Sequence, residues 1–227
     1  MIDQMALVTG ASSGIGQAIV DRLLVEGWQV IGLSRSALTR QHPALQSYQV
    51  DVSDAAALQK VLARLPVPQA LVHAAGMMQA APLGELDLHA SARLWQLHVA
   101  AAEQLANHCA PRMTSGGRIV LLGSRTSGGA AGRSQYVATK SAMIGMVRSW
   151  AAELAPRGIT ANIVAPGATD TPMLQQPGRG SSPPRLPPIG RFIQPEEVAG
   201  LVHFLLTPAA AAMTGQQLVL CGGASLS

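Results

Sequence analysis

The chain has 227 residues, of which 48% are hydrophobic, 12% are charged and 3% are aromatic, and its formal net charge is +4. This length allows a full hydrophobic core, and so apolar a composition excludes an intrinsically disordered chain. No apolar run reaches the roughly 18 residues of a membrane-spanning helix, and the arginines are scattered with few aromatic residues among them, so we expect neither membrane insertion nor nucleic-acid binding.

Short apolar runs alternate along the chain with longer segments of helical periodicity. The runs predict strands at 5–8, 28–33, 48–50, 70–73, 118–122, 159–164 and 217–220. Helices are expected at 15–26, 54–64, 88–112, 134–154 and 195–206, with Asp54 as the amino-terminal cap of the second. The alternation predicts an α/β fold, in which a parallel sheet of about seven strands has helices on both faces. We find no linker and no repeat, so residues 1–227 are expected to form one domain.

Residues 175–188 interrupt this alternation with five prolines and two glycines. Prolines at this density exclude an ordinary helix or a central strand. The segment follows a strand end, which is the edge of such a sheet where ligands bind. We interpret it as a lid over the substrate, and a plain surface loop is the alternative.

The cysteines and histidines do not predict a metal site. The chain has two cysteines, Cys109 and Cys221, and six scattered histidines. Their number and spacing indicate neither a disulfide framework nor a metal centre and are typical of a reducing cytoplasm. The amino-terminal residues are typical of a first strand rather than a signal peptide.

A glycine-rich turn lies between the first predicted strand and the first predicted helix. It reads Thr9-Gly10-Ala11-Ser12-Ser13-Gly14-Ile15-Gly16. Glycines allow a tight turn and a close backbone approach, and the free N–H groups at a helix start attract phosphate. The turn therefore predicts a binding site for the pyrophosphate of a dinucleotide.

Further motifs follow this turn in order along the chain. They are D-V-S-D at 51–54, H-A-A-G at 73–76, Gly123-Ser124, Y-V-A-T-K at 136–140 and A-N-I-V-A-P-G-A-T-D-T-P at 161–172. Over nearly its whole length the chain resembles the short-chain dehydrogenase/reductase family, single-domain type. The resemblance implies a Rossmann-type, doubly wound sheet and reversible hydride transfer between a nicotinamide cofactor and a carbonyl or alcohol.

The resemblance also assigns cofactor contacts. They are Gly10, Ser12, Ser13, Gly14, Ile15 and Gly16 at the turn, Asp51 and Val52 at the adenine, Ala75 and Gly76 at its ribose, and Tyr136, Lys140, Pro166, Gly167, Thr169 and Thr171 towards the nicotinamide. An NAD enzyme needs a carboxylate at the end of the second strand, where this chain has Ser34 followed by Arg35. A guanidinium can bind a 2′-phosphate, so we expect NADP(H) in preference to NAD(H); the alternative is that Arg35 is one more surface arginine.

The catalytic prediction starts from Tyr136 and Lys140, which lie one helical turn apart in a chain with only two tyrosines and two lysines. A cation at that distance stabilises the phenolate and lowers the pKa of the tyrosine. By resemblance, Tyr136 is the acid/base, Lys140 also holds the nicotinamide ribose, and Ser124 orients the substrate oxygen, with Ser127 as the alternative. Where the family usually has an asparagine, this chain has His98, which either keeps a proton relay or is a packing residue.

The substrate pocket is expected to be lined by Ser124, Thr126, Gly167, Met173 and Leu174, whereas the sequence does not decide whether Arg125 faces into it. The leading prediction is an NADP(H)-dependent carbonyl reductase or alcohol dehydrogenase acting on a small molecule. The alternatives are a 3-oxoacyl reductase of fatty-acid type, which would need a basic surface at the pocket mouth, and a non-catalytic NADP-binding sensor or scaffold.

The helices expected at 88–112 and 134–154 carry many small residues beside Trp95, Met143, Met146 and Trp150. So much apolar surface on a soluble chain favours self-association. We expect a homo-oligomer, a tetramer rather than a dimer, and the alternative is that these helices only cover the sheet within one chain.

Overall fold

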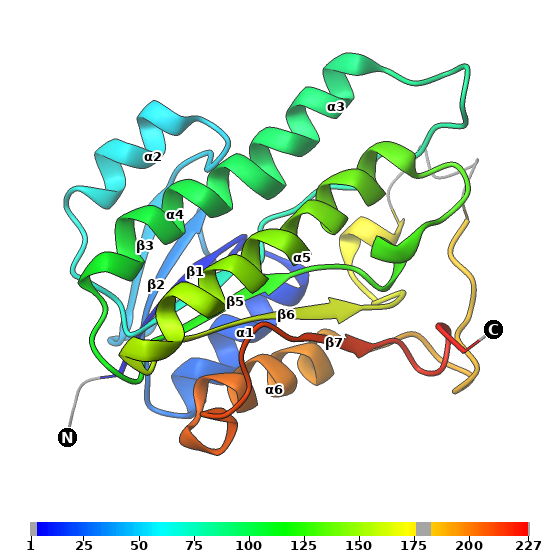
Figure 1. The fold of residues 1–227 in the computed structure, drawn as a ribbon. Coiled ribbons are helices and arrows are strands. Elements are labelled where there is room, and N and C mark those ends of the chain that lie inside the picture. Colours follow the sequence, from blue (N-terminus) through cyan, green and yellow to red (C-terminus); the bar gives the residue numbers. More distant parts are fainter. Residues whose placement is uncertain (1–3, 176–182, 227) are drawn as a thin grey trace.

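The fold is built on one parallel sheet, shown in Figure 1 by a computed structural model that describes residues 4–175 and 183–226. Its strands are β1 (Met5–Thr9), β2 (Gln29–Ser34), β3 (Leu45–Gln49), β4 (Ala70–His73), β5 (Arg118–Leu122), β6 (Thr160–Pro166) and β7 (Gln217–Leu220). Their order is β3-β2-β1-β4-β5-β6-β7, and every neighbouring pair is parallel. The predicted Rossmann-type sheet of seven strands is confirmed.

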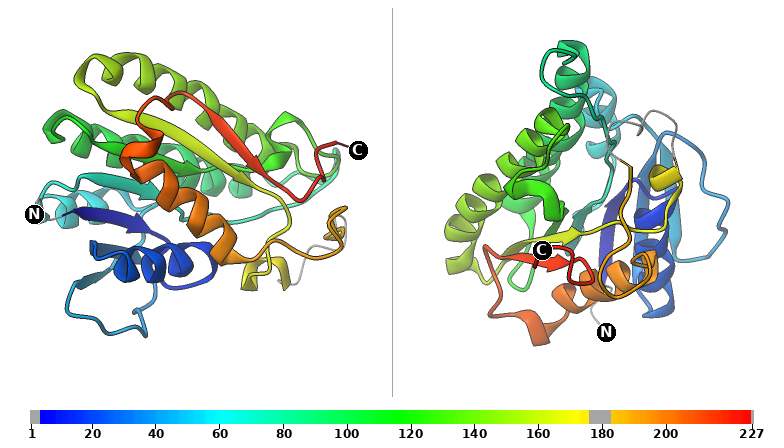
Figure 2. Two further views of the ribbon diagram at one scale, coloured as in Figure 1. Left: turned by 90° about the horizontal axis from the view of Figure 1, so that it is seen from below. Right: turned by 90° about the vertical axis from the view of Figure 1, so that its right-hand side faces the viewer.

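Helices cover both faces of this sheet (Figure 2). They are α1 (Gly14–Val25), α2 (Ala55–Leu62), α3 (Leu88–Trp95), α4 (Ala101–Cys109), α5 (Ser134–Leu154) and α6 (Pro195–Leu206). Successive residues of β1 point to opposite faces, so Leu7 joins the core under α2, α4 and α5, whereas Val8 joins the core under α1 and α6. Burial on both faces explains why the central strands are short continuous apolar runs.

Local signals in the sequence fix several helix ends. The Asp54 carboxylate accepts hydrogen bonds from the backbone N–H groups of Ala56 and Ala57, both at 3.0 Å, so the predicted cap of α2 is confirmed. Pro195 is the first residue of α6, where its missing N–H costs no hydrogen bond. Short 3₁₀ turns occupy Ala110–Arg112, Arg125–Gly128, Ala155–Arg157, Pro172–Gln175 and Pro208–Ala210. No helix within 4–175 or 183–226 is long and apolar enough to cross a membrane.

Two predicted elements differ from the structure. The single helix expected at 88–112 is divided, because a π-helical turn at Gln96–Ala100 joins α3 to α4. The strand expected at 48–50 is β3, Leu45–Gln49, a sheet-edge strand whose side chains are all half-buried or exposed. Half-burial leaves no dense apolar run, so the pattern did not reveal its start.

The sheet also positions the functional site. β1 pairs with β2 on one side and with β4 on the other, and the chain leaves β1 and β4 at the same edge. Loops that leave adjacent parallel strands towards opposite faces open a crevice at the carboxyl ends of those strands. A ligand site is therefore expected beyond Thr9 and His73.

Candidate active site

A cleft of about 490 Å³ lies at the carboxyl ends of β1 to β4. Such a volume is within the usual range of about 300–1,000 Å³ for small-molecule and cofactor sites. The predicted cofactor residues that line it are Gly10, Ser12, Ser13, Gly14, Ile15, Gly16, Ser34, Arg35, Asp51, Val52, Ala75, Gly76 and Thr171. The fold thus brings together the glycine-rich turn and the segments expected at the adenosine end.

The glycine-rich turn fits a pyrophosphate because side chains are excluded there. A Cβ on Gly16 would lie 2.1 Å from the carbonyl oxygen of Gly10, and a Cβ on Gly10 would lie 2.8 Å from the backbone nitrogen of Ala75. Gly10 also has φ +68°, which glycine adopts without strain. Among the described residues, no side-chain hydrogen bond from Ser13 caps α1, so the N–H groups of its first turn are available to an anion in the cleft.

At the adenosine end, the end of β2 presents a cation. Arg35 is exposed and borders the cleft, and the hydroxyl of Ser34 donates to the carbonyl oxygen of Ser36 at 2.7 Å. The Asp51 carboxylate accepts from the hydroxyl and backbone N–H of Ser53, at 2.6 and 2.9 Å. The Ser53 hydroxyl and N–H, together with the charge of Arg35, hold the pKa of Asp51 below its ordinary value against the effect of burial.

Several residues of this cleft were not anticipated from the sequence. They are Leu33, Ser36, Val50, Ser53, Ala74, Met77, Arg93, Leu97 and Pro172, while Met173, expected in the substrate pocket, lines this cleft as well. Arg93 is the most consequential, because it brings a second cation to the cleft from α3, where it also lies 3.7 Å from the Asp87 carboxylate. Only the packing of α3 beside the cleft could show this, since no local pattern marks Arg93.

A smaller cavity of about 130 Å³ contains the predicted catalytic side chains Ser124 and Tyr136. The expected nicotinamide residues Pro166, Gly167 and Thr169 line it as well, and so do the expected substrate residues Thr126, Gly167, Met173 and Leu174. Ile15, Thr171 and Met173 line both this cavity and the cofactor cleft. The two spaces are therefore neighbours that share a wall.

Ser124 and its alternative Ser127 have different surroundings. The Ser124 hydroxyl lies 2.9 Å from the hydroxyl of Thr126, and Ser124 lines the cavity. The Ser127 hydroxyl accepts a hydrogen bond from the side-chain amide of Gln217 at 2.8 Å, and Ser127 does not line the cavity. The geometry therefore favours Ser124 as the substrate-orienting residue.

Lys140 is buried beneath the same site. Its ammonium nitrogen donates to the carbonyl oxygen of Leu122 at 2.7 Å and lies 5.9 Å from the centre of the Tyr136 ring. A Cβ added to Gly76 would be 3.9 Å from this nitrogen, which places Lys140 next to the wall of the cofactor cleft. Burial lowers the pKa of Lys140 to about 7.

His98 lies in the π-helical turn and makes hydrogen bonds through both ring nitrogens. Nε2 accepts from the backbone N–H of Met77 at 3.1 Å, and Nδ1 lies 2.9 Å from the hydroxyl of Thr139. That hydroxyl donates to the carbonyl oxygen of Tyr136, so Nδ1 carries the proton and donates. Burial, and then the charge of Lys140, hold the pKa of His98 well below its ordinary value. The ring packs edge-on against Tyr136, with their centres 5.7 Å apart.

His73 is the last residue of β4 and forms a hydrogen bond to the π-helical turn. Its Nε2 donates to the carbonyl oxygen of Leu97 at 3.0 Å, and its Nδ1 accepts from the hydroxyl of Thr9 at 2.9 Å. The Thr9 hydroxyl in turn accepts from the backbone N–H of Ala75 at 3.1 Å. His73 thus ties β1, β4 and the π-helical turn that carries His98 into one network.

The predicted lid is only partly described, because 176–182 lie outside the described residues. An isolated β-bridge joins Thr169 to Ile193, on either side of the chain segment that contains the predicted lid. Pro184 and Arg185 line the cavity of Ser124 and Tyr136, so this end of the segment adjoins the predicted substrate site. Among the described residues, no group of three or more His, Cys, Asp or Glu side chains could hold a metal ion.

Comparisons with known proteins agree with this geometry. The family model for "Enoyl-(Acyl carrier protein) reductase" matches residues 10–225. A cyclic-di-GMP-binding biofilm dispersal mediator protein of Escherichia coli is 35% identical over 95% of this chain and 94% of its own. A cis-4-hydroxycyclohexanecarboxylate dehydrogenase of Sinomonas cyclohexanicum is 33% identical over 97% and 96%. The 3-oxoacyl-(acyl-carrier-protein) reductase FabG of Escherichia coli is 32% identical over 97% and 96%.

Solved structures have the same fold over the whole chain. A short-chain dehydrogenase family protein from Francisella tularensis superposes with a TM-score of 0.91 at 25% identity, covering 99% of each chain. A short-chain dehydrogenase from Burkholderia cenocepacia in complex with NADP has a TM-score of 0.88 at 32% identity and covers 98% of each chain.

Proposed function

Because the chain belongs to the short-chain dehydrogenase/reductase family, we propose that it is an NADP(H)-dependent oxidoreductase that transfers a hydride between the nicotinamide and a carbonyl or secondary alcohol. The observation that carries this proposal is the wall formed by Ile15, Thr171 and Met173, which the cofactor cleft shares with the cavity of Ser124 and Tyr136. A nicotinamide that extends along this wall would meet a substrate held by those two side chains.

The bound nicotinamide supplies or accepts the hydride. In the reductive direction, Tyr136 donates its phenolic proton to the carbonyl oxygen, and the Ser124 hydroxyl donates a hydrogen bond that orients that oxygen. The Lys140 ammonium, 5.9 Å from the ring centre, stabilises the phenolate that remains. In the oxidative direction the same phenolate accepts the proton of the alcohol.

The preference for NADP(H) rests on charge at the end of β2. A carboxylate there would repel a 2′-phosphate, and the chain has Ser34 and Arg35 instead. Arg35 is exposed at the rim of the cleft and can form charge-assisted hydrogen bonds with a phosphate. The NADP in the Burkholderia structure is consistent with this preference.

The proposal is tested by following NADPH and NADH absorbance with a panel of ketones and aldehydes, and NADP⁺ and NAD⁺ reduction with secondary alcohols. Turnover of at least one carbonyl, faster with NADPH, is expected. The similarity to FabG makes acetoacetyl-coenzyme A the probe for a 3-oxoacyl reductase. The similarity to a cyclic-di-GMP-binding protein supports the alternative of a sensor. Tight NADPH binding without turnover of any compound would favour the sensor and reject the enzyme.

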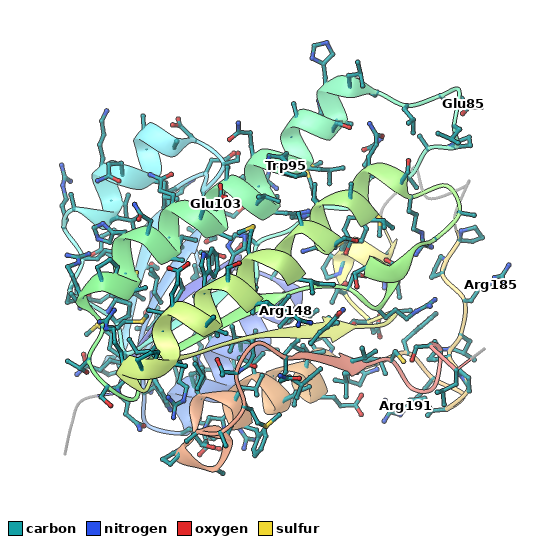
Figure 3. All side chains as sticks on the ribbon, in the orientation of Figure 1. Glu85, Trp95, Glu103, Arg148, Arg185 and Arg191 are labelled. Carbon is teal, nitrogen blue, oxygen red and sulfur yellow. The ribbon has the colours of Figure 1, made fainter. Side chains whose placement is uncertain are left out.

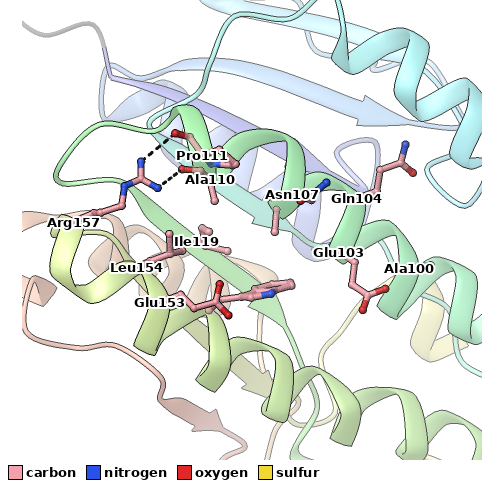
Figure 4. A pocket seen from close by; sticks show the side chains of 12 residues that line it. Ala100, Glu103, Gln104, Asn107, Ala110, Pro111, Ile119, Glu153, Leu154 and Arg157 are labelled. Carbon is pink, nitrogen blue, oxygen red and sulfur yellow. Dashed lines mark hydrogen bonds between the residues drawn. The ribbon is translucent and has the colours of Figure 1, made fainter.

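We further propose that the α4 and α5 faces pair between copies in a homo-oligomer, with a tetramer expected rather than a dimer. A groove of about 800 Å³ runs between these helices (Figure 4). Trp150, Ala106 and Leu154 are among the apolar residues that line it. Glu103 and Glu153 also line the groove, and Arg157 donates to the carbonyl oxygens of Ala110 and Pro111 at one end. A groove of this size with apolar side chains in its wall is typical of a surface that a partner covers.

A further inference from the structure

Three arginines line the cavity that holds Ser124 and Tyr136. They are Arg125, Arg133 and Arg185. Arg125 follows Ser124 directly, and Arg133 is the amino-terminal cap residue of α5, three residues before Tyr136. Arg185 borders the cavity from the described end of the proline-rich segment, and its exposed side chain projects outward at the right-hand side of the molecule in Figure 3. No described residue that lines this cavity is acidic.

Four of the arginines elsewhere in the described part of the chain form ion pairs with carboxylates. Arg191 makes two hydrogen bonds to Glu197, at 2.7 and 2.8 Å, and Arg22 lies 2.7 Å from Glu26. By contrast, neither Arg125 nor Arg185 forms an ion pair with any carboxylate in the described part of the chain. Arg125 uses one N–H group, which donates to the carbonyl oxygen of Ala224 at 3.2 Å. A guanidinium has five N–H donors, so most of those on Arg125 remain available.

The uncharged lining of the rest of this cavity strengthens the attraction of the three arginines for an anion. None of its other lining residues is charged, and the apolar ones among them are Ile15, Met78, Pro166, Ala168, Met173, Leu174 and Pro184. Positive charges gathered on a partly apolar wall attract a compact anion, and a guanidinium binds a carboxylate through two parallel hydrogen bonds. The space of about 130 Å³ suits a small molecule rather than a bulky one.

We propose that the substrate is a small oxo acid or hydroxy acid, whose carboxylate is bound by Arg125 and Arg133 with Arg185 at the mouth of the cavity. This proposal rests on the oxidoreductase function proposed above and names its substrate class. In the reductive direction, the hydride of NADPH adds to the carbonyl carbon and the oxygen takes the proton of Tyr136. NADPH becomes NADP⁺, the C=O bond becomes an alcohol, and the carboxylate is unchanged.

The test compares matched acids and amides. The wild-type protein is assayed by NADPH oxidation with oxo acids whose carbonyl and carboxylate are separated by one to four carbons, each paired with its neutral primary amide. A charge-assisted pair lost in a partly apolar site weakens recognition by about ten- to hundredfold, so we expect the best acid to exceed its amide in kcat/KM by that factor. Equal use of acid and amide would overturn the proposal and leave the oxidoreductase function standing.

Variants then locate the anion site. Arg133→Gln and Arg125→Gln should each lower the acid-to-amide ratio of kcat/KM about tenfold or more, and Arg125→Lys, which keeps the charge but loses the fork, should lower it less. Arg64→Gln, at an exposed position outside both cavities, is the matched control and should leave the ratio unchanged. Thermal unfolding of each variant shows whether it is folded. If Arg125→Gln does not fold because the contact with Ala224 is lost, the comparison is made with Arg125→Lys instead.

The remaining outcomes separate this proposal from the function on which it rests. If acetoacetyl-coenzyme A is turned over and no free oxo acid is, the proposal of a small acid is overturned, and the substrate is a thioester whose carrier bears phosphate. No turnover of any carbonyl, charged or neutral, would refute the oxidoreductase function itself. An acid preference that survives both glutamine variants would place the anion site elsewhere.

Discussion

His73 should make the folded protein less stable as the pH falls from 7.5 to 5. The ring is fully buried, and both of its nitrogens are used in the neutral form, one towards Thr9 and one towards Leu97. Burial, with a smaller effect from the charge of Lys140, lowers the pKa of His73 to about 4. The unfolded chain should have the ordinary histidine value of about 6.5.

The sign follows from which state binds the proton. Between pH 6.5 and 4 the unfolded chain is protonated at His73 whereas the folded chain is not, so acid favours unfolding in this range. The difference between 6.5 and about 4 corresponds to about 3 kcal/mol in total. About 2 kcal/mol of this stability is lost by pH 5 and the rest below it. Lys140 and His98 act in the same direction, so the wild-type loss should be larger still.

The contribution of His73 is isolated by measuring urea unfolding at pH 7.5 and pH 5 for the wild type, His73→Asn and the exposed control His89→Asn. The free energy of unfolding of His73→Asn should fall by about 2 kcal/mol less over this range than that of the wild type. The two pH values are compared within one variant, so any cost of the substitution itself cancels. All samples need the same protein concentration, because self-association adds to stability. An equal fall in wild type and His73→Asn would refute a buried neutral His73.

Three further predictions test the proposed chemistry, cofactor and assembly. Tyr136→Phe keeps the ring but removes the proton donor, so kcat should fall about 10² to 10⁴-fold with NADPH affinity retained in a fluorescence titration; a loss under tenfold with chemistry rate-limiting would move the donor elsewhere. Arg35→Asp should lower kcat/KM for NADPH at least about tenfold while that for NADH holds or rises, and a parallel change in both would remove Arg35 as the discriminator. Trp150→Glu places a charge in the α4–α5 groove, so sedimentation equilibrium should show a smaller assembly than for the wild type; an unchanged mass would mean that this face is not the interface.

The sequence predicts most of this fold because the apolar runs, the helical periodicity and the helix-cap residues indicate the same elements. The strands at the centre of the sheet are buried on both faces, so each is a continuous apolar run, whereas the edge strand β3 is half-exposed and its limits were wrong. The division of the helix expected at 88–112 could not be foreseen either. The Leu97 carbonyl in its π-helical turn accepts a hydrogen bond from His73, 24 residues away, and a local sequence pattern does not reveal such a contact.

The candidate site shows the same limit. Motifs place Ser124, Tyr136 and Lys140 near one another because strand ends and one helix face are regular. Side-chain direction in loops is not regular, so Arg133 and Arg185 gave no sign that they line the same cavity. The proline-rich segment was expected to lie near the substrate. That its Arg185 adds positive charge to the cavity of Ser124 and Tyr136 could be learned only from the three-dimensional structure.

His98 was left open between a proton relay and a packing residue, and its contacts favour a positioning role. A relay must release one proton and accept another, yet Nδ1 donates to Thr139 and Nε2 accepts from Met77. The low pKa of His98 also makes the charged form unfavourable near neutral pH. Through Thr139, whose hydroxyl donates to the carbonyl oxygen of Tyr136, the ring instead fixes the first turns of α5.

A positioning role predicts how His98→Leu and Thr139→Val should behave. Both variants break the same chain of hydrogen bonds to Tyr136, so each should lower kcat by less than about hundredfold, and the double variant should lose little more than the worse single one. The pH dependence of kcat should keep its shape, because neither residue exchanges a proton with the substrate. A relay would give the opposite pattern: His98→Leu would lose more than about hundredfold with an altered pH profile, while Thr139→Val would retain most of the rate.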